Sequence, residues 1–148
     1  MKRSVAVAAA ATAIVVVGLS GCSSSSTPGQ KVSTGGHAKV VIDGKDQNAQ
    51  GPVTCQQAGG ALQIGIGQGQ GAVAVQGTDG NPPNVQQIAL GTVNGVPLAY
   101  QQGSPGASVQ ATKNGNDYKF TGTAMGMDPA NAAAGMVSKS FEVDVTCP

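Results

Sequence analysis

The sequence is poor in the residues on which most catalytic and nucleic-acid-binding sites depend. It has no Trp, two Tyr, two Phe and a single His among 148 residues, and only 10% of its residues are charged. Its eight basic and seven acidic residues form no block of one sign, which argues against a nucleic-acid-binding surface. Because the single histidine, His37, lies in a predicted linker, the folded part lacks the base of a hydrolase. We therefore expect one domain that is not an enzyme.

Two stretches resemble ligand-binding loops only in part. Gly65, Gly67, Gly69 and Gly71 are not followed by Gly-Lys-Ser/Thr or by a long helix, so we predict a mobile connection between strands rather than a phosphate loop. The segment from residue 46 begins like a calcium loop, but Gln57 stands where the bidentate Glu is needed. The sequence therefore predicts no metal and no cofactor.

The N-terminus has the pattern of a bacterial lipoprotein signal peptide over residues 1–21. Lys2 and Arg3 precede an uncharged apolar run over residues 5–17, which is short for a membrane span. The run is followed by Leu-Ser-Gly-Cys at residues 19–22, the small-residue arrangement called a lipobox. We predict cleavage before Cys22 and its acylation, which anchors a protein stably when two or more chains are attached. The alternative is an ordinary secretory signal with a chance cysteine.

The remaining cysteines, Cys55 and Cys147, form an even pair in an exported, oxidising compartment. We predict a disulfide between them, which closes a long loop and contributes about 4–5 kcal/mol to stability. The alternative is two buried free thiols. A metal site is poorly supported, because two cysteines and one distant histidine do not provide four ligands.

Residues 22–37 are rich in Ser, Thr and Gly and almost free of apolar side chains, which is typical of a flexible linker. We predict that this tether lifts a single domain, residues 38–148, off the lipid surface. The alternative is a plain spacer that carries no modification. The candidates for O-glycosylation are the hydroxyl groups of Ser24, Ser25, Ser26, Thr27, Ser33 and Thr34.

From residue 38 onward, short runs of alternating apolar and polar residues are separated by Gly, Asn, Asp and Pro. The pattern predicts a mostly β fold: a single small antiparallel β-sandwich or half-barrel-like domain of eight or nine strands, with one short helical turn and one disulfide. The helical turn is expected at residues 129–136, after Asp128. The main strands are expected at residues 40–42, 53–57, 62–66, 73–76, 85–93, 96–102, 107–113, 116–126 and 141–147.

Two Asn-Gly pairs predict tight hairpin turns. At residues 114–115 a type I′ turn pairs Ala111 with Tyr118 and Val109 with Phe120 on one apolar face.

The second turn, at residues 94–95, pairs Thr92 with Pro97. Continuing this register places Ile88 and Leu90 on the same face as Pro97, so that both faces of the ribbon are apolar. The ribbon is therefore expected to lie in the centre of the fold or to cover another part of the molecule. Because Pro97 lacks an N–H, we expect a sheet edge on its side.

Several long segments resemble the mycobacterial nineteen-kilodalton lipoprotein antigen family: KVVIDGKDQN at 39–48, TDGNPP at 78–83, VNGV at 93–96, GTA at 122–124, KSFE at 139–142 and VTC at 145–147. The resemblance implies an envelope lipoprotein that is triacylated at Cys22, O-glycosylated in its linker, disulfide-bonded between Cys55 and Cys147, and sensed by host Toll-like receptor 2 through its lipid. The linker here is shorter and richer in Ser than that family's Thr-rich tract. No enzyme activity comes with the resemblance.

Together these observations predict a lipid-anchored surface antigen on the extracytoplasmic face of the cell membrane, with the membrane and a host receptor as its partners. One alternative is a small lipid or glycolipid carrier, suggested by the two-sided apolar ribbon. A domain with four aromatic residues barely furnishes the cavity that a carrier needs. The other alternative is an envelope scaffold or adhesin that uses a strand edge or a loop.

Overall fold

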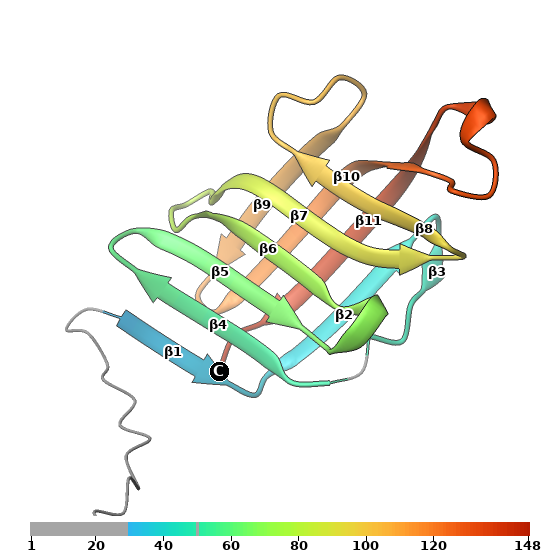
Figure 1. The fold of residues 1–148 in the computed structure, drawn as a ribbon. Helices are drawn as coiled ribbons and strands as arrows, with labels where there is room; N and C mark the ends of the chain where they lie inside the picture. Colours follow the sequence, from blue (N-terminus) through green and yellow to red (C-terminus); the bar gives the residue numbers. More distant parts are fainter. Residues whose placement is uncertain (1–29, 50) are drawn as a thin grey trace, which may run out of the picture.

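The computed structural model describes residues 30–49 and 51–148. In this part of the chain, eleven strands form one antiparallel sheet in the order β1-β4-β5-β6-β7-β8-β10-β11-β2-β3, with β9 beside β10. The sheet folds back on itself into two layers, whose strands cross in Figure 1. The predicted mostly β, antiparallel fold is confirmed, and the sheet is not closed, because its end strands β1 and β3 do not pair with each other.

Each layer is a set of hydrogen-bonded neighbours. The first layer contains β1 (Gln30–Thr34), β4 (Val53–Ala58), β5 (Ala61–Ile66), β6 (Val73–Thr78), β7 (Asn84–Val93) and β8 (Val96–Gln101). The second contains β2 (His37–Ile42), β3 (Lys45–Asp46), β9 (Ser108–Asn114), β10 (Asp117–Met127) and β11 (Met136–Thr146). Two 3₁₀ turns are the only helical segments in the described residues, η1 (Gly69–Gly71) and η2 (Ala132–Ala134).

The inner faces of the two layers enclose one continuous apolar core. Alternate residues of the central strands are buried, because successive side chains of a strand point to opposite faces. Tyr118 and Phe120 of β10 stack at the centre with ring centroids 6.2 Å apart. None of the polar or charged residues that the structure describes is buried. The free energy gained by burying apolar side chains is therefore reduced little by the cost of removing polar groups from water.

At one corner the sheet passes from the first layer to the second through β10. β11 pairs along the whole of β10, whereas the other edge of β10 is shared by β9 and, beyond it, by β8. The contact with β8 is formed at Met125 and Gly126. A Cβ on Gly126 would collide with the carbonyl oxygen of Pro97, so this close approach of two strands requires glycine.

At the opposite corner the chain itself crosses between the layers. β1 pairs with β4 in the first layer and β2 pairs with β11 in the second, and only Gly35 and Gly36 lie between β1 and β2. Gly36 has a φ of 80°, and a Cβ there would collide with the carbonyl oxygen of Thr146. This corner therefore depends on a residue without a side chain.

The β7–β8 hairpin confirms the predicted turn and corrects the predicted faces. Asn94 and Gly95 have φ values of 52° and 83°, as a type I′ turn requires, and Thr92 lies opposite Pro97. Beyond them the register shifts by one residue at a bulge around Gly91.

The bulge reverses the alternation, so Ile88 and Leu90 face the core with Leu98 and Tyr100. The expected two-sided apolar ribbon is therefore wrong, and the ribbon gives no support to a lipid carrier. The expected sheet edge beside Pro97 is also wrong, because β8 pairs with β10 at Leu98 and Ala99 on that side.

The β9–β10 hairpin lies on the predicted face but in a different register. Asn114 pairs with Asp117, so Ala111 lies opposite Phe120 instead of Tyr118. The turn residues are Gly115, with a φ of 63°, and Asn116, and glycine at the first turn position is typical of a type II′ turn. The shift of two residues keeps every side chain on its expected face, because the period of a strand is two.

Two other expected segments differ in extent. The segment predicted as the end of the linker forms β1, and His37 begins β2, so strand structure starts before residue 38. The helix candidate at residues 129–136 is reduced to η2, while Asp128 accepts a hydrogen bond from the N–H of Ala130 over 2.9 Å. The glycine-rich segment forms part of β5 and then η1, which connects β5 to β6 as expected.

The substitution Gly36→Ala should lower the free energy of unfolding by about 2–4 kcal/mol, because it adds steric overlap to an unfavourable positive φ. Gly44→Ala is the matched control: Gly44 has a φ of 76°, but no atom lies within 4 Å of the place a Cβ would take, so a loss of about 1 kcal/mol is expected. Urea unfolding of both variants measures the difference. Equal losses would show that the corner has no special steric demand.

Candidate functional site

The predicted anchor lies outside the described residues, as do Ser24, Ser25, Ser26 and Thr27. The described chain begins at Gln30, the first residue of β1, which lies at the free edge of the first layer (Figure 1). Any tether from Cys22 therefore enters the domain through this edge strand. Within the described residues, no helix has the length and apolar character needed to cross a membrane.

The two remaining glycosylation candidates lie on β1 and differ in exposure. Thr34 is exposed, whereas Ser33 is half-buried and lies opposite Cys55. Ser33 lines a small cavity of about 160 Å³ together with both disulfide cysteines. Of these two hydroxyl groups, the one of Thr34 is thus the more accessible.

The disulfide joins the two layers close to the point where the tether enters. Cys55 belongs to β4 in the first layer, and Cys147 directly follows β11 in the second, with 5.8 Å between their Cα atoms. Both cysteines are buried, and the Cys147 N–H donates a hydrogen bond to the carbonyl oxygen of Asn116 over 2.9 Å. The predicted bridge is therefore present in the structure, and it spans 92 residues.

A polar cluster beside the disulfide, which we call the interlayer tie, also joins the layers. Lys113 Nζ donates to Asp79 Oδ1 over 2.6 Å, and the Tyr118 hydroxyl donates to the same oxygen over 3.2 Å. Gln57 Nε2 donates to the Tyr118 hydroxyl oxygen over 2.7 Å. The Lys113 ammonium also lies 5.2 Å from the centroid of the Tyr118 ring, a cation–π distance.

The tie sets the protonation of its lysine. The hydrogen bond to Asp79, and then the one with Tyr118, raise the pKa of Lys113 above its ordinary value of 10.5. The lysine and aspartate side chains are only 22% and 25% exposed, so their interaction is partly shielded from solvent. The ammonium form is thus held firmly, which suits a structural contact and makes Lys113 a poor base or nucleophile.

Sequence reasoning missed the interlayer tie. Its members are separated by up to 61 residues, so no local motif contains them. One signal was available: alternation along β9 places Lys113 on the same face as Val109 and Ala111, which points a lysine inward at the end of a strand. An inward lysine requires a partner, but the sequence does not identify Asp79 as that partner.

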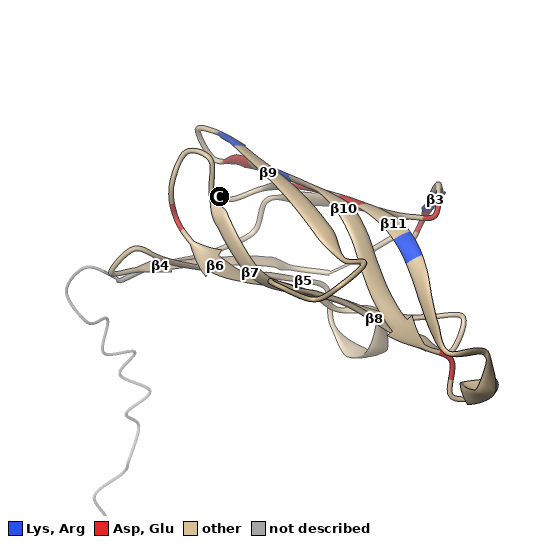
Figure 2. Cartoon of the chain, turned by 90° about the horizontal axis from the view of Figure 1, so that it is seen from above, with Lys and Arg blue, Asp and Glu red and all other residues tan. Residues whose placement is uncertain are grey.

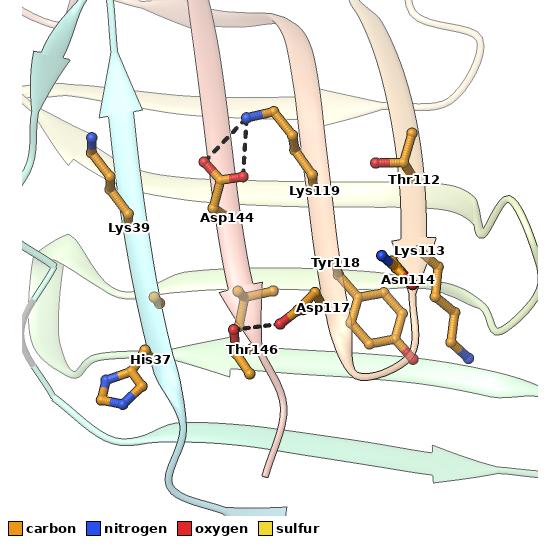
Figure 3. Close-up of a pocket in the computed structure, with 12 residues that line it drawn as sticks. His37, Lys39, Thr112, Lys113, Asn114, Asp117, Tyr118, Lys119, Asp144 and Thr146 are labelled. Atoms are coloured by element: carbon orange, nitrogen blue, oxygen red, sulfur yellow. Dashed lines mark hydrogen bonds and ion pairs between the residues drawn. The ribbon is translucent and has the colours of Figure 1, made fainter.

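A shallow groove of about 430 Å³ lies on the layer formed by β2, β9, β10 and β11. Figure 3 shows two interactions among its polar side chains, Lys119 with Asp144 and Thr146 with Asp117. Lys119 Nζ lies 3.0 Å from Asp144 and 3.1 Å from Glu142, and Thr146 Oγ1 donates to Asp117 over 2.6 Å. The two carboxylates, first Asp144 and then Glu142, raise the pKa of Lys119.

The described contacts of the groove are cross-strand ion pairs and one hydrogen bond between a hydroxyl and a carboxylate. His37 lies at its margin, on β2 instead of in a linker, and it has no hydrogen-bonding side-chain partner among the described residues. The described residues contain no group of three His, Cys, Asp or Glu side chains arranged to hold a metal ion. The ion pairs and the hydrogen bond join neighbouring strands and so stabilise the sheet.

Comparison with known proteins gives consistent matches along the chain. The family model described as Mycobacterium 19 kDa lipoprotein antigen matches residues 31–147. Lipoprotein LpqH of Mycobacterium tuberculosis is 48% identical over a 163-residue alignment that covers 99% of each chain. Lipoprotein LpqH of Mycobacterium avium is 52% identical over 109 residues, covering 74% of this chain and 67% of that protein.

Replacing both cysteines by alanine, Cys55→Ala with Cys147→Ala, should lower the free energy of unfolding by about 4 kcal/mol, because the unfolded chain regains the entropy of a long loop. Denaturant unfolding with and without a reducing agent measures this loss. Reduction should destabilise the wild-type protein to a similar extent and leave the double variant unchanged. An unchanged wild-type midpoint on complete reduction would contradict a stabilising bridge.

Removal of the interlayer tie should change the dependence of stability on pH. Because the folded-state pKa of Lys113 is raised, its stabilisation of about 1 kcal/mol is fully present below the unfolded-state pKa of 10.5 and is lost as the pH rises through the folded-state value. Urea unfolding of wild type and Lys113→Met should therefore differ at neutral pH and converge in strong alkali. Lys39→Met, which removes a lysine without an ion-pair partner among the described residues, should show no such convergence.

Proposed function

Because the chain belongs to the mycobacterial 19 kDa lipoprotein antigen family, we propose that it is a lipid-anchored antigen of the cell envelope whose attachment point is Cys22. The observation that carries the proposal is the lipobox at residues 19–22, which follows the apolar run of the signal peptide. The mature protein then begins at Cys22, with a thioether-linked diacylglyceryl group and an acylated amine. Two or more acyl chains suffice for stable anchoring.

The anchored domain lies on the extracytoplasmic side of the membrane in this proposal. The disulfide between Cys55 and Cys147 supports this side, because such bonds persist in oxidising compartments. The segment from Cys22 to residue 29 acts as the tether. Its Ser24, Ser25, Ser26 and Thr27 are the proposed O-glycosylation sites, with Thr34 as an accessible additional site on β1.

Recognition by the host is proposed to depend on the lipid instead of on a pocket of the domain. The acylated Cys22 is the group that Toll-like receptor 2 senses in this proposal, as the family resemblance implies. The domain itself is proposed to be non-enzymatic. In support, the polar side chains of its described part form structural pairs, such as Lys113 with Asp79 and Lys119 with Asp144.

The substitution Cys22→Ala tests the anchor and the receptor signal together. The wild-type protein from the membrane fraction should have the intact mass of residues 22–148 plus acyl groups, and it should activate reporter cells that express Toll-like receptor 2. Cys22→Ala should lose the acyl mass, leave the membrane fraction and fail to activate the cells, because no thiol remains to be acylated.

Ser23→Ala is the matched control, since it changes the neighbouring residue and keeps the thiol. It should behave as the wild-type protein in all three measurements. A Cys22→Ala protein that remains membrane-bound and active would contradict the proposal.

A further inference from the structure

From β4 to β8, the outer face of the first layer has no charged side chain. Strands β4, β5, β6, β7 and β8 contain no Lys, Arg, Asp or Glu and are tan throughout in Figure 2, whereas the second layer holds the charges. Between β3 and β9 the single charged residue that the structure describes is Asp79, which lies in a loop and bonds to Lys113. A face of this kind provides no electrostatic attraction for an anionic surface or polymer.

A row of glutamines crosses this neutral face. The strand register places one glutamine of each strand directly opposite the glutamine of the next strand, from β4 to β8. The row consists of Gln56, Gln63, Gln76, Gln87 and Gln101. Since neighbouring strands lie about 4.7–4.9 Å apart, the row is roughly 19 Å long.

The glutamine amides are available to a ligand. All members of the row are exposed except Gln56, which is half-buried. None of them forms a side-chain hydrogen bond within the described part of the chain, although the neighbouring Gln102 does, to Asn84. A glutamine amide presents two donor hydrogens and an acceptor oxygen without a charge, so it matches a hydroxyl group, which also donates and accepts.

A second row of residues, which have small side chains, lies beside the glutamines. Two residues away along each strand, the register aligns small side chains on the same outer face. They are Thr54, Gly65, Ala74, Ala89 and Ala99. The two rows together, which we call the shelf, run side by side across the strands, and the second row adds only small side chains to it.

We propose that this shelf binds a neutral polysaccharide whose chain runs along the glutamine row. The face favours an uncharged ligand, because it supplies no counter-charge. It also favours a ligand with repeated groups that donate and accept hydrogen bonds, because the amides repeat from strand to strand. Neither row contains an aromatic ring, so affinity comes from several weak amide contacts acting together. Binding is therefore weak for short oligosaccharides and increases with chain length.

The proposal is tested by NMR on the ¹⁵N-labelled mature chain in micelles of a detergent without a sugar headgroup. The probes are neutral hexose and pentose oligosaccharides, from disaccharides to octasaccharides. At least one series should shift the side-chain amide signals of the glutamine row, with a Kd on the order of 1 mM for the longer members and weaker binding for the disaccharides. The affinity should not change with salt, because no ion pairs are involved.

Gln76→Ala, at the centre of the row, should weaken binding at least about fivefold, as expected for one lost hydrogen-bonding group. The matched control is Gln110→Ala, which removes an exposed glutamine from β9 in the other layer and should leave the affinity unchanged. Urea unfolding confirms that both variants remain folded.

Three outcomes would overturn the proposal. One is that no oligosaccharide of either series shifts the glutamine signals. Another is salt-dependent binding of an acidic polyuronate at this face in place of the neutral chains. The third is concentration-dependent broadening of the glutamine signals without sugar, together with a dimeric mass in solution, which would show that a second copy of the chain covers the shelf.

Discussion

The whole domain depends on folding one sheet so that a single apolar face is buried against itself. A flat sheet of these strands would leave Val, Ile and Leu side chains in water along its entire length, and burial of each large side chain is worth about 1.5–3 kcal/mol. Folding the sheet requires two sharp corners. Glycines at residues 36 and 126 make the corners sterically possible, and the bond between Cys55 and Cys147 holds the layers together near one of them.

The need to hold the two layers together also accounts for the position of the interlayer tie. Between the corners, the two layers are connected by side chains alone, and a small core without Trp leaves limited dispersion energy. The interlayer tie adds hydrogen bonds from Asp79 in the first layer to Lys113 and Tyr118 in the second. These contacts join the layers at the same end of the domain as the disulfide.

The outer faces of the two layers differ in charge. The second layer carries cross-strand ion pairs such as Lys119 with Asp144, which satisfy one another. Strands β4 to β8 of the first layer are uncharged, and their glutamine row follows from the strand register. The domain thus presents one charged surface and one uncharged surface, and the uncharged one carries an ordered row of amides.

The sequence by itself determined the features that depend on local chemistry: the β class from alternation, the turn at Asn94, the cysteine pairing from parity and compartment, and the family from long matching segments. Only the tertiary structure decided the rest. The bulge at Gly91 turned Ile88 and Leu90 into the core, the turn at Gly115 shifted a register by two, and Lys113 met Asp79 from 34 residues away. Each of these depends on which distant strands pack together, and burial of the shared apolar face decides that in competition with local preference.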